Sequence, residues 1–205
     1  MDNIIKFFLY FLFFTVIHSF LATDRAKNQA QKLLGKRFRY YRLLYSLISI
    51  PLFAPALIVW IMYSNSTPVI YAITHNFYPV IVFVRLGAIG MFGYALLQTD
   101  VLEFIGIKRQ KKNALVTGGA YALVRHPLYT AGILLLITNM QMTLLDLTAV
   151  LLVTGYFVIG AFIEEKRLLS IFGDEYRKYQ EEVSMFIPVK WFIRKISRKN
   201  LLQIY

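Results

Sequence analysis

The chain contains no cysteine, and it has only three histidines and eleven acidic residues among its 205 positions. The lack of cysteine excludes a disulfide framework, a zinc–thiolate site, an iron–sulfur cluster and a cysteine nucleophile. The histidines, His18, His75 and His126, lie far apart in the sequence, which argues against a histidine-based metal site. We therefore expect a protein that works without a bound metal.

Apolar residues are abundant instead, since 58% of the chain is hydrophobic. A soluble domain averages about 45–50% apolar residues, so this composition does not suit a surface that faces water. The 23 basic residues leave a net charge of +12. A basic excess can indicate nucleic acid, but together with this hydrophobicity it favours a lipid bilayer as the partner, and we expect no nucleic acid.

Five stretches are long and apolar enough to be membrane spans, because a bilayer core about 30 Å thick needs roughly 20 apolar residues in a helix. They cover residues 4–22, 43–63, 78–98, 127–143 and 144–163. The last two follow each other with almost no loop and predict a helical hairpin. The fold class that this pattern predicts is all-α, a polytopic membrane protein with five transmembrane helices.

Basic residues are unevenly distributed among the segments between the spans. Residues 23–42 hold seven basic and one acidic residue, and residues 100–126 hold five and two. Residues 164–205 hold nine and six, whereas residues 64–78 carry no formal charge. Cytoplasmic loops are enriched in lysine and arginine, so we expect the amino terminus outside and the carboxyl terminus in the cytoplasm. This predicts an integral protein, with the inner membrane of a prokaryote as the favoured location.

The carboxyl-terminal residues mix apolar and basic side chains. The apolar ones are Trp191, Phe192, Ile193, Ile196, Leu201 and Leu202, and the basic ones are Lys190, Arg194, Lys195, Arg198 and Lys199. This mixture predicts a cytoplasmic amphipathic helix that lies on an anionic leaflet.

A first candidate site lies where the predicted fourth span begins, at Arg125, His126 and Pro127. Proline suits the first turn of a helix, and the free N–H groups of that turn can bind a carboxylate with help from the helix dipole. The alternative is that Arg125 is an interfacial anchor and His126 an interfacial polar residue.

A second candidate site, Glu164-Glu165, lies where the predicted fifth span ends. Two carboxylates at a membrane boundary are costly unless they are solvated or paired, and adjacent helical residues point about 100° apart. A solvated helix end with Glu165 paired to a lysine is the alternative. Since the two spans form a hairpin, residues 125–129 should meet the glutamates at the same depth. A pocket with cationic groups, a helix start and a carboxylate suits a zwitterionic ligand.

These residues resemble a known family. The run 115–132, with Arg125-His126-Pro127-Leu128-Tyr129 within it, resembles the isoprenylcysteine carboxyl methyltransferase and phospholipid methyltransferase superfamily. The pattern continues in Glu164-Glu165, Phe172-Gly173, Tyr176, Tyr179, Val183 and Pro188, so the likeness covers about residues 100–190. Residues 18–45 are similar to bacterial members, including methanethiol methyltransferase-like and denitrification-associated membrane proteins.

The resemblance implies S-adenosylmethionine as the cofactor, bound between the cytoplasmic end of the hairpin and the carboxyl-terminal segment. The expected cofactor-binding residues are Asn113, Ala114, Leu115, Val116, Tyr121, His126, Tyr129 and Glu164. The expected catalytic residues are His126, Arg125 and Glu165. A thiol or amine acceptor must lose a proton, for which His126 or a glutamate can act as base, whereas a carboxylate acceptor needs none.

The sequence has no internal repeat, low-complexity tract or flexible linker that would divide it into domains. We expect one membrane domain over residues 1–205, with three amino-terminal spans in 1–99, a cofactor-binding and catalytic part in 100–190, and an interfacial basic tail in 191–205.

The chain departs from the prenylcysteine enzymes at one position. Those enzymes are expected to have an arginine one turn before the glutamates, whereas this chain has Gly160 there and no basic residue in 156–163. Carboxyl methylation of a prenylated protein is therefore disfavoured, unless Arg85 substitutes. We expect a lipophilic or small membrane-partitioning acceptor. The alternatives are an NADPH-dependent reductase of a sterol-like or unsaturated lipid, and a non-catalytic membrane protein.

Overall fold

The structure is a computed structural model, and it describes residues 1–99 and 114–202, with side chains through residue 197 at the carboxyl-terminal end. The described residues group into two compact units. The first consists of residues 1–78 and 139–153, and the second of residues 79–98, 114–138 and 154–202. One long helix, α7 (Leu144–Phe172), contributes its first ten residues to the first unit and the rest to the second.

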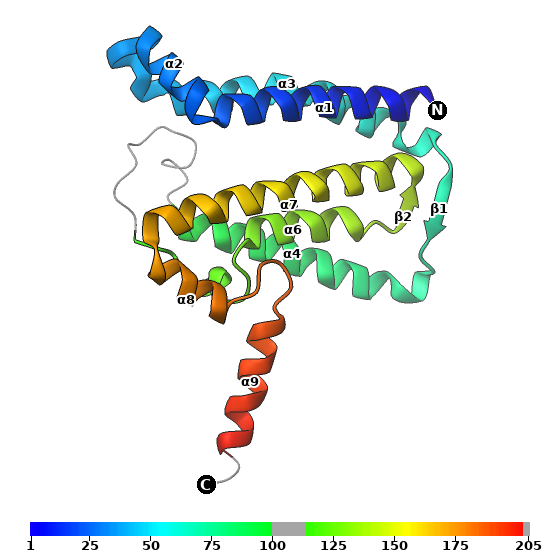
Figure 1. Cartoon of the computed structure of the whole chain (residues 1–205). Coiled ribbons are helices and arrows are strands. Elements are labelled where there is room, and N and C mark those ends of the chain that lie inside the picture. Colours follow the sequence, from blue (N-terminus) through cyan, green and yellow to red (C-terminus); the bar gives the residue numbers. More distant parts are fainter. Residues whose placement is uncertain (100–113, 203–205) are drawn as a thin grey trace. The chain divides into compact units, whose positions relative to one another are not determined.

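In the first unit, helices α1 (Asp2–Ala22) and α3 (Tyr41–Tyr63) lie side by side (Figure 1). Aromatic rings pack between them, with Phe14 and Phe53 5.1 Å apart at their centroids. The polar connection consists of α2 (Asp24–Leu34) and the 3₁₀ turn η1 (Gly35–Tyr40). Thr23 begins α2, because its hydroxyl accepts a hydrogen bond from the backbone N–H of Ala26 at 3.2 Å.

A short antiparallel pair of strands joins two connections that are distant in the sequence. The 3₁₀ turn η2 (Ser64–Ser66) leads into strand β1 (Val69–Ala72), which pairs with β2 (Gln141–Thr143) just before α7. Asp146, in the first turn of α7, is 7% exposed. Its carboxylate accepts hydrogen bonds from Trp60 Nε1 at 2.8 Å and Ser64 Oγ at 2.6 Å. It also accepts bonds from the backbone N–H and hydroxyl of Thr143, at 3.0 and 2.8 Å.

The second unit begins with helix α4 (Tyr78–Gln98). The chain enters this helix from the 3₁₀ turn η3 (His75–Phe77), which belongs to the first unit. The described chain resumes at residue 114 and forms η4 (Gly119–Ala122) and α6 (Pro127–Ile137). The carboxyl-terminal part of α7 is followed by α8 (Asp174–Glu182) and α9 (Val189–Leu202). The turn between α7 and α8 is made by Gly173, whose φ of 54° is unfavourable for residues with a side chain.

A small apolar cluster holds α8 in the second unit. It consists of the buried residues Tyr176, Tyr179 and Val183, against which Leu115, Tyr121, Leu168, Leu169 and Phe172 pack. Tyr179 donates a hydrogen bond to the carbonyl oxygen of Tyr121 at 2.7 Å. Burial raises the pKa of both phenols of α8, so they stay neutral at physiological pH.

The described chain is mostly helical and has four helices long and apolar enough to cross a membrane. They lie in Asp2–Ala22, Asp24–Ser66, His75–Gln98 and Leu144–Phe172, which matches four of the five predicted spans. The predicted span over 127–143 differs. Helix α6 ends at Ile137, and residues 141–143 extend to pair with β1 rather than continuing the helix. Eleven helical residues rise about 16 Å, roughly half of a bilayer core. The all-α class is therefore correct except for this strand pair, and the count of five crossings stays a prediction.

Candidate functional site

The candidate site is formed by the start of α6, the last turns of α7 and the segment that follows α8. The chain enters α6 with Pro127 as its first residue, and His126, just before it, makes no side-chain cap bond within the described part. The backbone N–H of Arg125 donates to the carbonyl of Ser184 at 2.9 Å, and that of His126 to the carbonyl of Met185 at 3.1 Å. The segment after α8 thus lies along the entry to α6.

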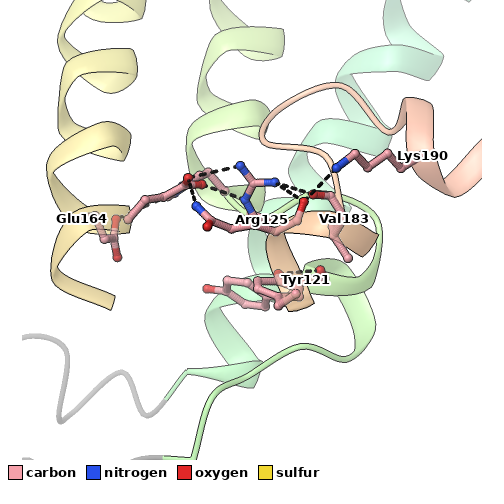
Figure 2. A network of polar contacts seen from close by, with 9 residues as sticks. Tyr121, Arg125, Glu164, Val183 and Lys190 are labelled. Atoms are coloured by element: carbon pink, nitrogen blue, oxygen red, sulfur yellow. Dashed lines mark hydrogen bonds and ion pairs between the residues drawn. The ribbon is translucent and has the colours of Figure 1, made fainter. Parts of the chain in front are cut away.

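Arg125 is the centre of the network in Figure 2. Its Nε lies 2.7 Å from Glu165 Oε1 and its Nη2 3.1 Å from Oε2, so the guanidinium binds the carboxylate with two parallel hydrogen bonds. Nη1 donates to the backbone carbonyls of Gln180, at 3.2 Å, and Val183. The Arg125 and Glu165 side chains are only 10% and 9% exposed. This buried ion pair ties α6 and α7 to the end of α8.

Two further groups complete the network. Gln180 Nε2 donates to Glu165 Oε2 at 2.7 Å, and Lys190 Nζ donates to the carbonyl of Gln180 at 2.8 Å. Figure 2 shows Lys190 approaching the network from the side opposite Glu164. The sequence did not indicate Gln180 or Lys190, because a glutamine on a polar helix and a lysine in a basic tail are typical of solvated surfaces.

His126 lies between the two glutamates. Its Nε2 is 3.0 Å from Glu165 Oε1, and its Nδ1 is 3.8 Å from Glu164 Oε2. The ring is stacked on Tyr129, with centroids 5.4 Å apart and planes 2° from parallel. Phe186 lies against it at 5.7 Å between centroids. The imidazole therefore has a fixed orientation at the helix start.

Glu164 differs from its neighbour because its side chain is 45% exposed. Its carboxylate accepts a hydrogen bond from the Tyr129 hydroxyl at 3.3 Å. Burial raises the pKa of Tyr121, and the negative charge of Glu164 raises it further. The phenol of Tyr121 is therefore close enough to Glu164 to feel its charge. Figure 2 shows Glu164 apart from the Arg125 network, with Tyr121 on a different element. Glu164 is thus a half-exposed carboxylate that contacts Tyr129 and lies 3.8 Å from His126 Nδ1.

The structure brings most of the residues predicted for the site into one region. Those within direct contact of one another are Arg125, His126, Tyr129, Glu164 and Glu165. Leu115 and Tyr121 pack in the neighbouring apolar cluster, and Ala114 and Val116 lie exposed in the extended stretch next to it. Asn113 lies outside the described residues. Their roles in binding and catalysis stay predictions.

Other candidates from the sequence lie in different surroundings. His18 is in the first unit, where Nδ1 is 2.8 Å from Ser49 Oγ and Nε2 bonds with the Tyr45 hydroxyl. Arg85 is half-buried in α4. A Cβ added to Gly160 would lie 3.9 Å from the Tyr129 hydroxyl. Gly160 is therefore next to the site. Among residues 1–99 and 114–202, no cluster of three histidine or acidic side chains could hold a metal ion.

Comparison with known proteins identifies the family. The family model described as NnrU protein matches residues 6–185. The chain belongs to the NnrU family. No solved structure matches it.

Relatives of this NnrU family member include named methyltransferases. It is 35% identical over 109 residues to a methanethiol S-methyltransferase of Pseudomonas sp. (strain GM41(2012)), which covers 47% of this chain and 42% of the relative. It is 37% identical over 91 residues to the protein-S-isoprenylcysteine O-methyltransferase of Schizosaccharomyces pombe, covering 42% and 38%. It is 35% identical over 103 residues to the cobalt-zinc-cadmium resistance protein CzcN of Cupriavidus metallidurans, covering 49% and 48%. The chain matches less than half the length of these relatives. The resemblance to the isoprenylcysteine carboxyl methyltransferase superfamily is confirmed.

Proposed function

We propose that the chain is an integral membrane methyltransferase that uses S-adenosylmethionine to methylate a lipophilic or small membrane-partitioning acceptor. The observation that carries this proposal is Glu164, a half-exposed carboxylate that accepts a hydrogen bond from Tyr129 and lies beside the start of α6 and the His126 ring. The two named methyltransferase relatives support the reaction class.

The chemistry of the site suits this cofactor. S-adenosylmethionine carries a positively charged sulfonium, an ammonium and a carboxylate, and when bound it supplies a methyl group on the charged sulfur. Glu164 would hold the ammonium or the ribose hydroxyls, and the ring of Tyr121 would favour a cation, whereas the Tyr129 ring is already stacked on His126 and Phe157. The first-turn N–H groups of α6, preceded by His126, would favour the carboxylate.

Arg125 and Glu165 act in this proposal as positioning residues. Each of the two carboxylate oxygens of Glu165 already accepts two hydrogen bonds, and Arg125 uses all three of its nitrogens within the network. Neither group is available to a ligand without losing these contacts. Their contribution is to hold His126, Glu164 and the segment after α8 in place, because rate gain from alignment depends on a rigid site.

The acceptor enters from the membrane side, and the charged cofactor from the cytoplasm. Long exposed apolar side chains on the four candidate spans, such as Phe83 and Leu97 of α4 at 78% and 83% exposed, suit contact with lipid. Helix α9 carries the exposed apolar residues Phe192, Ile193 and Ile196 and a cation–π contact between Lys195 and Trp191 at 4.8 Å. These features support a tail that lies on an anionic leaflet. The inner membrane of a prokaryote is the proposed location.

Calorimetry of the detergent-purified full chain tests the function. We expect heat of binding with S-adenosylmethionine and its demethylated product but not with NADPH. Glu164→Ala should weaken cofactor binding about tenfold or more, since it removes the one exposed carboxylate of the site. Glu175→Ala, which removes an exposed glutamate on α8, is the matched control and should bind like the wild type.

The same measurement separates the rival functions. Heat with NADPH alone would favour a reductase, and no heat with any of the three ligands would favour a non-catalytic protein. Equal cofactor affinity in the Glu164→Ala and Glu175→Ala variants would remove Glu164 from the site.

A further inference from the structure

The hydrogen bonds around Glu165 determine where the proton of His126 resides. Glu165 Oε1 accepts from Arg125 Nε at 2.7 Å, and Oε2 accepts from Arg125 Nη2 at 3.1 Å and from Gln180 Nε2 at 2.7 Å. A carboxylate bound in this way by a guanidinium is ionised and has no proton to donate. His126 Nε2, 3.0 Å from Oε1, must therefore be the donor in that contact.

The other ring nitrogen is then unprotonated in the neutral imidazole. The group that the described chain places near Nδ1 is the Glu164 carboxylate, whose Oε2 lies 3.8 Å away and so is too distant for a hydrogen bond. Tyr129 stacks on one face of the His126 ring, and Glu165 contacts its Nε2. The Nδ1 side of the ring therefore faces the half-exposed Glu164.

We propose that His126 is the general base of the reaction, held as the Nε2–H tautomer by Glu165, and that the methyl acceptor is a protic nucleophile, a thiol or an amine. This rests on the proposed methyltransferase function. A proton taken up by Nδ1 produces an imidazolium between two carboxylates, Glu165 at 3.0 Å and Glu164 at 3.8 Å. That arrangement stabilises the protonated base in the way a carboxylate–imidazole pair does in other enzymes.

The bond changes balance in this proposal. The acceptor's sulfur or nitrogen gives its proton to Nδ1 and forms the new bond to the methyl carbon. The bond from that carbon to the sulfonium breaks, and its electron pair stays on the sulfur as a neutral thioether. The proton on His126 then passes to water. No oxidant, reductant or metal is needed.

The surroundings of Gly160 support a protic acceptor over a carboxylate. A carboxylate acceptor needs a cationic group to hold it, and residues 156–163 contain no basic residue. Two cations that lie close are already engaged. Arg125 binds Glu165 and two backbone carbonyls, and Lys190 Nζ donates to the Gln180 carbonyl. A thiol or amine needs a base instead of a cation, and the structure provides a base.

Nuclear magnetic resonance of the full chain with ¹⁵N-labelled histidine tests the tautomer without any cofactor. With three histidines in the chain, His126→Gln identifies the His126 signals by their loss. We expect a protonated Nε2 and an unprotonated Nδ1 in the neutral form of His126. His18 serves as an internal reference with the opposite tautomer, because the Ser49 hydroxyl donates to the Tyr45 carbonyl at 2.7 Å and so must accept from His18 Nδ1. A protonated Nδ1 in neutral His126 would overturn the proposal.

The His126→Gln variant also tests the base directly, since the glutamine amide can still donate to Glu165 but cannot take a proton. At saturating S-adenosylmethionine we expect a loss of about 10²–10⁴-fold in the rate of methyl transfer to a thiol such as methanethiol. An undiminished rate would overturn the base, even if the cofactor binds. A wild-type chain that binds no S-adenosylmethionine would instead overturn the proposed function and the base role with it, whichever tautomer the spectra show.

Discussion

At the scale of single residues, the side chain of Gln98 connects the end of α4 to residues 118–120. Gly119 has a φ of +59°, and Gln98 lies over it, accepting from the Ala120 N–H at 2.9 Å and donating to the Gly118 carbonyl at 3.1 Å. The end of α4 is thereby joined to the stretch that carries Tyr121 and leads to Arg125. Glycine suits this position because of the positive φ, and a Cβ there, 2.0 Å from Gln98 Nε2, would also displace the Gln98 amide.

Gly119→Ala should therefore destabilise the protein by about 1–3 kcal/mol, because it combines a strained backbone with a steric clash. The measurement is thermal unfolding of the purified protein in detergent. Gly118→Ala is the matched control, since Gly118 has a φ of −91° and no neighbour within 4 Å of its added Cβ. If both variants lose the same stability, the contact with Gln98 has no special importance.

The two glutamates show the limit of sequence reasoning at this scale. Helical geometry predicted that only one of two adjacent glutamates faces a given pocket. The structure shows that Glu165 is buried against Arg125 and His126, while Glu164 is half-exposed. The sequence could not distinguish them, because their partners come from segments 40 residues earlier and 15 residues later.

At the scale of secondary-structure elements, the end of α3, the strand pair and the start of α7 meet at Asp146. Four hydrogen bonds from Trp60, Ser64 and Thr143 satisfy its buried carboxylate. The periodicity of the sequence predicted the long helices well, because apolar length alone identifies a span. It did not predict the pairing of β1 with β2, which depends on residues about 70 positions apart.

Asp146→Asn should cost about 1–3 kcal/mol of stability, because an amide group would face donors where a carboxylate oxygen now accepts. Chemical or thermal unfolding in detergent measures the loss. Asn65→Ala provides the comparison, since Asn65 is exposed and lines the same cavity of about 300 Å³ as Asp146. A loss of less than about 0.5 kcal/mol for Asp146→Asn would show that the hydrogen bonds of this carboxylate are replaceable.

At the scale of the whole molecule, the number of membrane crossings decides whether the two termini lie on the same side of the bilayer. Strand β1 lies between α3 and α4, and β2 comes directly before α7. If α4 crosses the bilayer, the chain has to cross back before residue 141 for the two strands to pair on one side. Helix α6 alone is shorter than a bilayer core, so a fifth crossing in this part of the chain stays a prediction.

The absence of native cysteine allows a clean test of this topology with single introduced cysteines and a membrane-impermeant maleimide on intact cells. We expect labelling of Asp2→Cys and Asn65→Cys but not of Glu175→Cys, because an odd number of crossings places the termini on opposite sides. Glu175→Cys should react only after the membrane is permeabilised. Labelling of Asp2→Cys and Glu175→Cys under the same condition would mean an even number of crossings.

The sequence by itself determined the helical membrane class, four of the spans, the family and most of the residues that gather at the site, because hydropathy and short motifs are local properties. Tertiary structure decided which glutamate is buried, that Arg125 is bound to Glu165 and to carbonyls at the end of α8, and which nitrogen of His126 contacts Glu165. It also decided that residues 141–143 form a strand. These features depend on partners that are distant in the chain, and a hydrogen bond is made only where folding brings donor and acceptor together.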